Sequence, residues 1–272
     1  MQMGTKLRQW VAAVVVASSA SVCGAAATPV SNWVVQTGAS VVSGTPTDPT
    51  FTPGDNITVM APFGDVTLAN DGEYVNLTAT LNVSTRATNT GTNALNTQLR
   101  FGIFDDNTNG GTVSASPNVG FIIEYSNVVA GGLIREQQST VQTSPFVSPT
   151  NLGNGTQDSG ADSLQGANIG PVVFNLTLTR VAGKLNLTGT ISGTDSVSGN
   201  PYLQNYSAAG ISSANFPSDG SFTFNRVGLF LGSNVDGPTA TISDAFVTVP
   251  EPSAIALAGL GMTSWLLKRR RA

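Results

Sequence analysis

Residues 73–83 read Glu73-Tyr74-Val75-Asn76-Leu77-Thr78-Ala79-Thr80-Leu81-Asn82-Val83, an alternation of polar and apolar side chains. Successive side chains of a β-strand point to opposite faces of the sheet, so the apolar residues of this stretch gather on one face. Tyrosine, asparagine and threonine cover the other face. The stretch therefore predicts a strand with one buried and one solvated face.

The same two-residue period recurs along the chain, and no stretch of its body has a helical period. Residues 173–178 and 184–191 predict a hairpin around Val181-Ala182-Gly183, where the glycine supplies the left-handed turn residue. Further strands are expected at residues 99–104, 119–125, 133–137, 222–231 and 240–249. Two polar excursions, 140–170 and 193–219, are expected to be loops. This organisation predicts an all-β domain built as a β-sandwich.

The last two expected strands indicate which type of β-sandwich the domain forms. Phe224-Asn225-Arg226-Val227-Gly228-Leu229-Phe230-Leu231 precedes a turn at Gly237-Pro238, and residues 240–249 follow it. This segment resembles the closing strands of concanavalin-like jelly rolls. The resemblance covers about 25 residues and implies a jelly roll among the β-sandwiches.

The C-terminal tail has three parts with different physical roles. Pro250-Glu251-Pro252 cannot continue a strand, because proline lacks the backbone N–H and has a fixed φ. An uncharged run of 14 residues follows from Ala254 to Leu267, short of the ~17–25 residues that usually cross a bilayer. The basic cluster Lys268, Arg269, Arg270 and Arg271 stays on the cytoplasmic side of a membrane. We expect a transmembrane helix here, with the body of the chain on the opposite side.

These three parts, in this order, resemble the PEP-CTERM sorting domain of Gram-negative bacteria. The resemblance covers residues 249–272 and implies that an exosortase processes the tail near Pro250, Glu251 and Pro252. It implies transient residence in the inner membrane and delivery to the cell surface or beyond. The alternative is a plain C-terminal anchor that is never cut.

The N-terminus predicts a secretory signal peptide over residues 1–27. Lys6 and Arg8 precede an apolar core, and Ala25-Ala26-Ala27 is a small-residue cleavage site for signal peptidase. Cleavage leaves Thr28 as the mature start. It also removes Cys23, the single cysteine, which would otherwise be a candidate for lipid attachment. The expected order is a signal helix, a secreted sandwich over residues 28–248 and the sorting signal.

Composition excludes most catalytic chemistry for the secreted body. The chain has no histidine, and its one cysteine lies in the signal peptide. Histidine-dependent nucleophiles, thiolate catalysis and the usual zinc sites are therefore excluded. Only three glutamates, Glu73, Glu124 and Glu136, lie in the body, and we expect them at strand faces or loop edges. We predict no catalytic residues and no enzymatic activity, although an unrecognised carboxylate pair would still permit hydrolysis.

The body carries 15 acidic and six basic side chains, a net charge near −9, while the two terminal signals hold the remaining cations. This balance argues against nucleic acid as a partner. Charged residues make up only 10% of the chain, and serine, threonine, asparagine and glycine replace them. Surfaces rich in hydroxyl and amide groups suit secreted proteins that contact polysaccharides.

One loop has the spacing of a calcium ligand set. Asp105, Asn107 and Asn109 precede Gly110, so oxygen ligands recur every second residue before a glycine turn. The twelfth position is Ser116 rather than glutamate, and the flanks are expected strands. A polar hairpin loop explains the same residues, so Ca²⁺ is the one cofactor that the sequence leaves open.

These observations predict an exported, non-enzymatic protein with a structural role in biofilm or extracellular matrix. Its expected partners are signal peptidase, exosortase and extracellular polysaccharide. The alternative is a jelly-roll carbohydrate-binding module stabilised by calcium. Trp33, the one tryptophan between the two signals, is the aromatic residue closest to a sugar platform, although a platform usually needs several coplanar rings.

Overall fold

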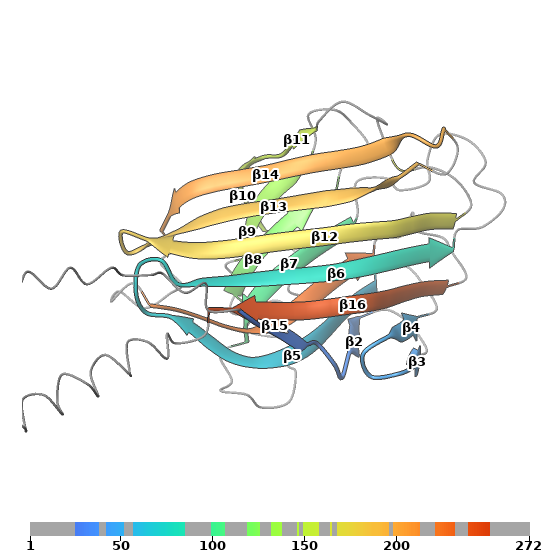
Figure 1. Ribbon diagram of the computed structural model, residues 1–272, viewed down its shortest axis with the longest axis horizontal. Coiled ribbons are helices and arrows are strands. Elements are labelled where there is room, and N and C mark those ends of the chain that lie inside the picture. The colour runs from blue at the N-terminus through green and yellow to red at the C-terminus, as the bar shows by residue number, and fades with distance from the viewer. Residues whose placement is uncertain are drawn as a thin grey trace, which may run out of the picture.

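The computed structural model describes residues 25–37, 42–51, 57–84, 99–106, 119–125, 132–137, 146, 149–157, 164, 168–195, 198–212, 221–231 and 239–250. All regular elements in these ranges are β-strands, and they form two antiparallel sheets packed face to face (Figure 1). The prediction of an all-β sandwich is therefore confirmed.

The first sheet, called sheet A, has nine strands among the described residues. Their order is β11 (Thr156–Gln157), β14 (Pro201–Ile211), β13 (Lys184–Thr194), β12 (Asn168–Val181), β6 (Tyr74–Ser84), β16 (Thr239–Val249), β4 (Pro49–Phe51) and β3 (Val42–Gly44). Strand β1 (Ala26–Pro29) also pairs with β16. The five long strands of sheet A run side by side in the front layer of Figure 1.

The second sheet, called sheet B, has seven strands in the same ranges. Their order is β10 (Thr150–Asn154), β9 (Leu133–Gln137), β8 (Val119–Glu124), β7 (Leu99–Asp105), β15 (Phe222–Leu231), β5 (Ile57–Leu68) and β2 (Val34–Thr37). Strands β15 and β16 thus lie in different sheets, although they follow each other in the chain.

The predicted hairpin joins β12 to β13 as expected. Val181 pairs with Lys184, and the two residues between them both have positive φ, 51° at Ala182 and 72° at Gly183. Positive φ at both positions is the geometry of a type I′ turn, whose twist matches that of the flanking strands.

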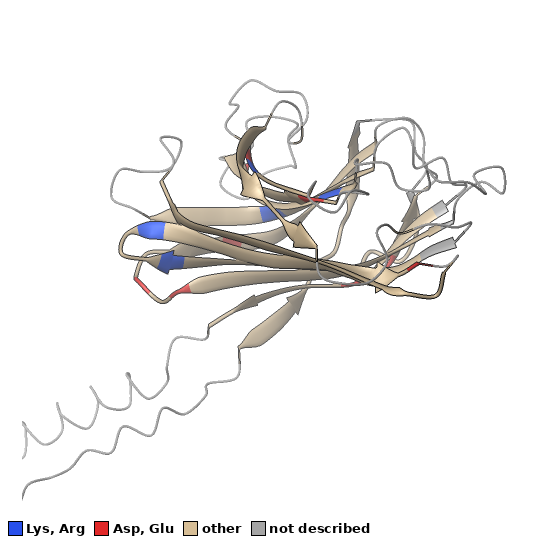
Figure 2. Ribbon diagram, turned by 90° about the horizontal axis from the view of Figure 1, so that it is seen from above, with Lys and Arg blue, Asp and Glu red and all other residues tan. Residues whose placement is uncertain are grey.

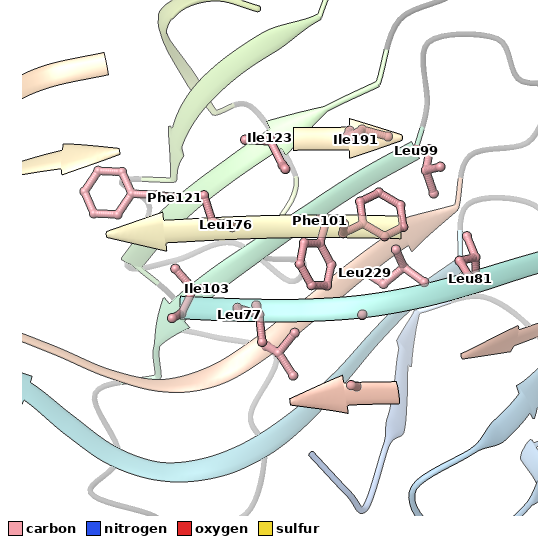
Figure 3. Close-up of a cluster of buried hydrophobic side chains, with 14 of the residues drawn as sticks. Leu77, Leu81, Leu99, Phe101, Ile103, Phe121, Ile123, Leu176, Ile191 and Leu229 are labelled. Carbon is pink, nitrogen blue, oxygen red and sulfur yellow. The ribbon is translucent and has the colours of Figure 1, made fainter. Parts of the chain in front are cut away.

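The main core lies between the sheets and follows the predicted alternation. Val75, Leu77 and Leu81 of β6 are at most 1% exposed, as are Leu176 of β12 and Phe101 of β7. Side chains from both sheets meet in this layer (Figure 3). Burial of each large apolar side chain contributes about 1.5–3 kcal/mol, so the layer is the principal source of stability.

The far face of sheet B also carries buried side chains. Met60, Phe104, Ile122 and Phe146 form a second apolar cluster there. The two phenylalanine rings fit against β15 because Gly228 has no side chain. A Cβ at this position would lie 2.8 Å from Phe104 Cε2 and 3.1 Å from Phe146 Cε2. Sheet B is therefore buried on both faces around this cluster.

Two sequence predictions were wrong in part. Residues 193–219 were expected to be a loop, yet they contain β14, whose Tyr202, Gln204 and Tyr206 are buried. Residues 140–170 contain β10, β11 and the start of β12. Both stretches are rich in serine, asparagine and glycine, so their weak hydrophobic pattern did not indicate strands.

The expected signal and transmembrane helices lie outside the described residues. Within the described ranges, no helix has the length and apolar character needed to span a membrane.

Candidate functional site

The segments beside the two predicted processing sites, β1 and the end of β16, lie side by side in sheet A. Strand β1 is antiparallel to the end of β16, with Ala26 opposite Val249, Ala27 opposite Thr248 and Thr28 opposite Val247. The Val30 N–H also donates to the Ala245 carbonyl at 2.8 Å. The predicted signal cleavage bond, between Ala27 and Thr28, therefore lies within this ladder. All four β1 side chains are exposed, so backbone hydrogen bonds rather than packing hold the strand.

The Pro250-Glu251-Pro252 part of the predicted sorting signal begins directly after β16. Pro250 is exposed and has no strand assignment, as expected for a residue that cannot donate to a ladder. Glu251, Pro252, Lys268, Arg269, Arg270 and Arg271 lie outside the described residues. The β1–β16 ladder nevertheless brings the start of the motif next to Ala25, which was predicted to flank the signal cleavage site.

Asp105, the first residue of the predicted calcium loop, ends β7 and is half-buried. Asn107 and Asn109 lie outside the described residues. The neighbouring Asp106 carboxylate is 1% exposed and lies 2.6 Å from the Arg226 guanidinium. It also accepts a hydrogen bond of 2.9 Å from Asn225 Nδ2.

Arg226 thus supplies the positive charge beside Asp106. No cluster of three or more acidic residues that could hold a metal ion occurs in the described part of the chain.

The three glutamates of the body occupy different environments. Glu124 was expected at a strand face or loop edge, and it is the last residue of β8. It is 5% exposed, and its Oε2 lies 3.1 Å from Arg100 Nε and 2.5 Å from Arg135 Nε. Glu136 on β9 is only 2% exposed. Paired with two guanidinium groups, Glu124 is held as a structural ion-pair partner.

Glu73 lies in the turn before β6, and its carboxylate binds backbone N–H groups of that turn. Its carboxylate accepts hydrogen bonds from the N–H groups of Ala69 at 2.6 Å and Asn70 at 2.9 Å. The Asn70 side-chain amide also donates to it at 2.8 Å, and this bond is the largest cause of the lowered pKa of Glu73. These contacts give Glu73 a structural role in the turn.

Three of the four tyrosines are buried and cannot serve as a sugar platform. The hydroxyls of Tyr202 and Tyr206 both donate to Gln204 Oε1, at 2.7 and 2.8 Å. The Tyr125 hydroxyl accepts a bond from the Leu164 N–H at 2.8 Å. Burial raises the pKa of Tyr125 and of Tyr206 well above the usual value, because the ionised phenolate would be desolvated.

An open hollow of about 250 Å³ lies beside Trp33. Its lining combines hydroxyl and amide groups with prolines: Asn32, Trp33, Ser43, Gly44, Thr45, Pro46 and Pro49. Trp33 is 6% exposed, and its indole N–H has no hydrogen-bond partner among the described residues. Most of the ring belongs to the core, so it presents little surface for stacking.

Comparison with protein families found one match. Residues 248–271 match the family model described as the PEP-CTERM protein-sorting motif. The chain therefore carries this motif, which indicates a protein that is exported and sorted to the cell envelope or surface. A comparison with curated proteins found no match.

Comparison with solved structures found distant lectin-like sandwiches. The carbohydrate recognition domain of Emp47p is similar at 13% identity and a TM-score of 0.42, covering 80% of this chain and 88% of that one. Arcelin-5, a lectin-like defense protein from Phaseolus vulgaris, is similar at 10% identity and a TM-score of 0.40, with coverages of 84% and 97%. The winged bean acidic lectin, solved with methyl-alpha-D-galactose, is similar at 11% identity and a TM-score of 0.40, covering 82% of this chain and 93% of that one.

At TM-scores of 0.42 or less and identities of 13% or less, no ligand and no role transfers from these structures to this chain.

Proposed function

We propose that this chain is a surface protein of a Gram-negative bacterium, exported under its signal peptide and processed by an exosortase at its sorting motif. The observation that carries the proposal is the match of residues 248–271 to the PEP-CTERM motif. After processing, the sandwich has a non-enzymatic, structural role in biofilm or extracellular matrix, with extracellular polysaccharide as its partner.

The pairing of β1 with β16 supports an order of events. Strand β16 is made last, so the bond between Ala27 and Thr28 has no ladder partner while the body is being synthesised and exported. Signal peptidase then acts on an extended, unpaired segment. Cleavage leaves two of the four pairs, Thr28 with Val247 and Pro29 with Phe246. Val249 and Thr248 lose their β1 partners just before Pro250, although Thr248 stays paired with Asn76 of β6.

The composition of the body supports a structural role. It has no histidine or cysteine, and Glu124, one of its three glutamates, is committed to two arginines. The groups that remain on its surface are mainly hydroxyls and amides, which form hydrogen bonds rather than perform catalysis.

Intact mass measurement of the chain from its native host tests the proposal. We expect the wild-type chain to begin at Thr28, to end near Pro252 and to occur outside the inner membrane. Glu251→Gln should retain the Arg269–Arg271 tail and accumulate in the membrane fraction. Asp244→Asn is the matched control, because it removes one exposed negative charge from nearby β16 and asparagine tolerates the φ of 51° found there.

A wild-type chain that keeps its arginine tail in the membrane would identify the tail as a plain anchor. Equal processing of the two variants would show that Glu251 is not read by the sorting enzyme.

The hollow beside Trp33 favours a second candidate function, a calcium-stabilised carbohydrate-binding module. Trp33 is the one tryptophan left after both ends are removed, so its fluorescence reports on this site alone. We would titrate the exported chain with neutral mono- and oligosaccharides, with CaCl2 and with EDTA. A saturable, calcium-dependent spectral shift supports this function, and spectra unchanged across the series contradict it.

A further inference from the structure

The solvated face of sheet A carries aligned rows of hydroxyl and amide side chains. The strand register places Ser207, Thr188, Thr177, Asn76 and Thr248 next to one another across β14, β13, β12, β6 and β16. A second row, two residues along each strand, contains Asn205, Thr190, Asn175 and Thr78, and Phe246 completes it on β16. We call these two rows the amide–hydroxyl face; it is turned toward the reader in Figure 1.

The rows follow from the sequence alternation together with the register. Each strand contributes every second residue, and antiparallel pairing without a shift in the middle of the sheet aligns these residues across strands. Asn76 links the two rows: its Nδ2 donates to Thr177 Oγ1 at 2.7 Å and to Asn175 Oδ1 at 3.0 Å. The side chains at the centre of the face are therefore held in place.

Charge is nearly absent from the strands that build this face. The five strands contain three charged residues, Arg180 and Lys184 beside the β12–β13 turn and Asp244 at the bulge of β16. Figure 2, seen from above, shows the strands mostly in tan with a few scattered charged residues. The strands share the low charge of the whole chain, in which 10% of the residues are charged against about a quarter in an average protein.

We propose that the amide–hydroxyl face binds an uncharged, extended polysaccharide, with the polymer lying across the strands. Threonine and serine hydroxyls donate and accept hydrogen bonds as sugar hydroxyls do, and asparagine adds two donors and an acceptor. Val173, 38% exposed, and the half-buried Phe246 lie on the same face and offer apolar contact to the C–H surface of a sugar ring. The acidic body would repel an anionic polymer, whereas an uncharged face imposes no electrostatic cost on a neutral one.

The spacing suits a repeating ligand. Neighbouring strands are about 4.8 Å apart, so the first row repeats a polar group at that interval over roughly 19 Å. Extended β-linked glycans repeat their rings at a similar interval, which lets one ring meet each strand. Each hydrogen bond contributes little by itself, but several aligned along one polymer add up. The inference rests on the proposed function in one respect, that the protein meets this polymer only after export.

Affinity electrophoresis of the exported chain tests the face. The gel contains hydroxyethyl cellulose as the neutral polymer, or alginate as the anionic one. We expect the wild-type chain to be retarded by hydroxyethyl cellulose, with little dependence on salt, and to pass alginate unretarded. Thr188→Glu and Thr188→Lys should each weaken retention about tenfold, because either charge would be desolvated against a neutral polymer. Thr67→Glu, at an exposed threonine of β5 in sheet B, is the matched control and should change retention less than about twofold.

Thermal unfolding verifies that each variant is folded, and Ser207→Glu, on the neighbouring strand, replaces any Thr188 variant that is not. A wild-type chain that passes both gels unretarded would overturn the proposal. Equal retention of wild type and both Thr188 variants would place binding elsewhere, with the Trp33 hollow the next region to test. Sedimentation showing wild-type dimers that Thr188→Glu dissociates would identify the face as an interface between copies. Failed export with intact retention would refute the proposed sorting and leave this inference standing.

Discussion

The buried pair of Arg226 and Asp106 permits a quantitative prediction about stability. Both side chains are 1% exposed, and Arg226 Nη2 lies 2.6 Å from Asp106 Oδ2. Asn225 fixes the carboxylate further, since its Nδ2 donates to Asp106 Oδ1 and its Oδ1 accepts from the Asp106 N–H at 3.1 Å. Removing one partner leaves the other charge buried without compensation, which costs about 3–5 kcal/mol.

We therefore expect Arg226→Met and Asp106→Asn each to lower the free energy of unfolding by about 3–5 kcal/mol. In a domain of this size that corresponds to roughly 10 °C in Tm. The double variant should lose less than either single variant, because asparagine keeps the acceptor for Asn225 and no charge remains buried. Urea unfolding followed by circular dichroism measures all three chains.

The Arg180–Asp71 pair is the matched control. Its nitrogen and oxygen are 3.7 Å apart and the Asp71 side chain is 56% exposed, so Asp71→Asn should cost less than about 1 kcal/mol. Strictly additive losses in the Arg226–Asp106 double variant would refute the reasoning, since they would mean that the two charges do not interact. Full restoration of Asp106→Asn by Ca²⁺ would likewise show that a metal ion, rather than Arg226, balances this site.

Three further predictions concern stability. Gly228→Ala should lower the free energy of unfolding in urea by about 1–3 kcal/mol, because the new Cβ would lie 2.8 Å from the Phe104 ring. Gly183→Ala is the control: the space around Gly183 is open, so only the smaller cost of an alanine at a φ of 72° is expected. Burial raises the pKa of Tyr206, so its contribution to the free energy of unfolding is complete below about pH 10 and is lost as the pH rises further. Tyr206→Phe should therefore make the loss of stability above pH 10 shallower in urea unfolding. An unchanged slope would contradict this assignment. Hydrogen bonds from Asn70 lower the pKa of Glu73, so the carboxylate stabilises the fold above its ordinary pKa near 4.5, and this contribution is lost as the pH falls. Glu73→Gln should lower the free energy of unfolding by about 0.5 kcal/mol at pH 7 and leave it unchanged at pH 2. An equal cost at both pH values would rule out the charge as the source of the effect.

Much of the fold could be predicted from local pattern. The alternation in residues 73–83 and the turn at Ala182-Gly183 gave strands and a hairpin that the structure contains. Strand β5 gave no such signal, because five consecutive residues, Ile57 to Ala61, are buried on both faces of sheet B. The fully buried Gln204 was missed for a related reason, since glutamine carries no hydrophobic signal and its position inside depends on two tyrosine hydroxyls.

The candidate sites also differ in whether a local sequence pattern or a tertiary contact defines them. The sorting motif is a short, contiguous pattern, so the sequence alone was enough to predict it, and the match of residues 248–271 confirms it. The signal peptide is a pattern of the same kind and stays a prediction. The burial of Glu124 could not be predicted, because its arginine partners lie 24 and 11 residues away and meet it only through strand pairing.

The sequence by itself determined the inward face of the alternating strands, the β12–β13 turn and the presence of the sorting motif, because sterics and side-chain period act between near neighbours. Only the tertiary structure decided which strands are adjacent. That choice placed Thr28 beside Val247, buried Asp106 against Arg226 and aligned Thr188 with Thr177 and Asn76 in one row. Register between distant segments depends on packing of the whole core, and no local pattern specifies it.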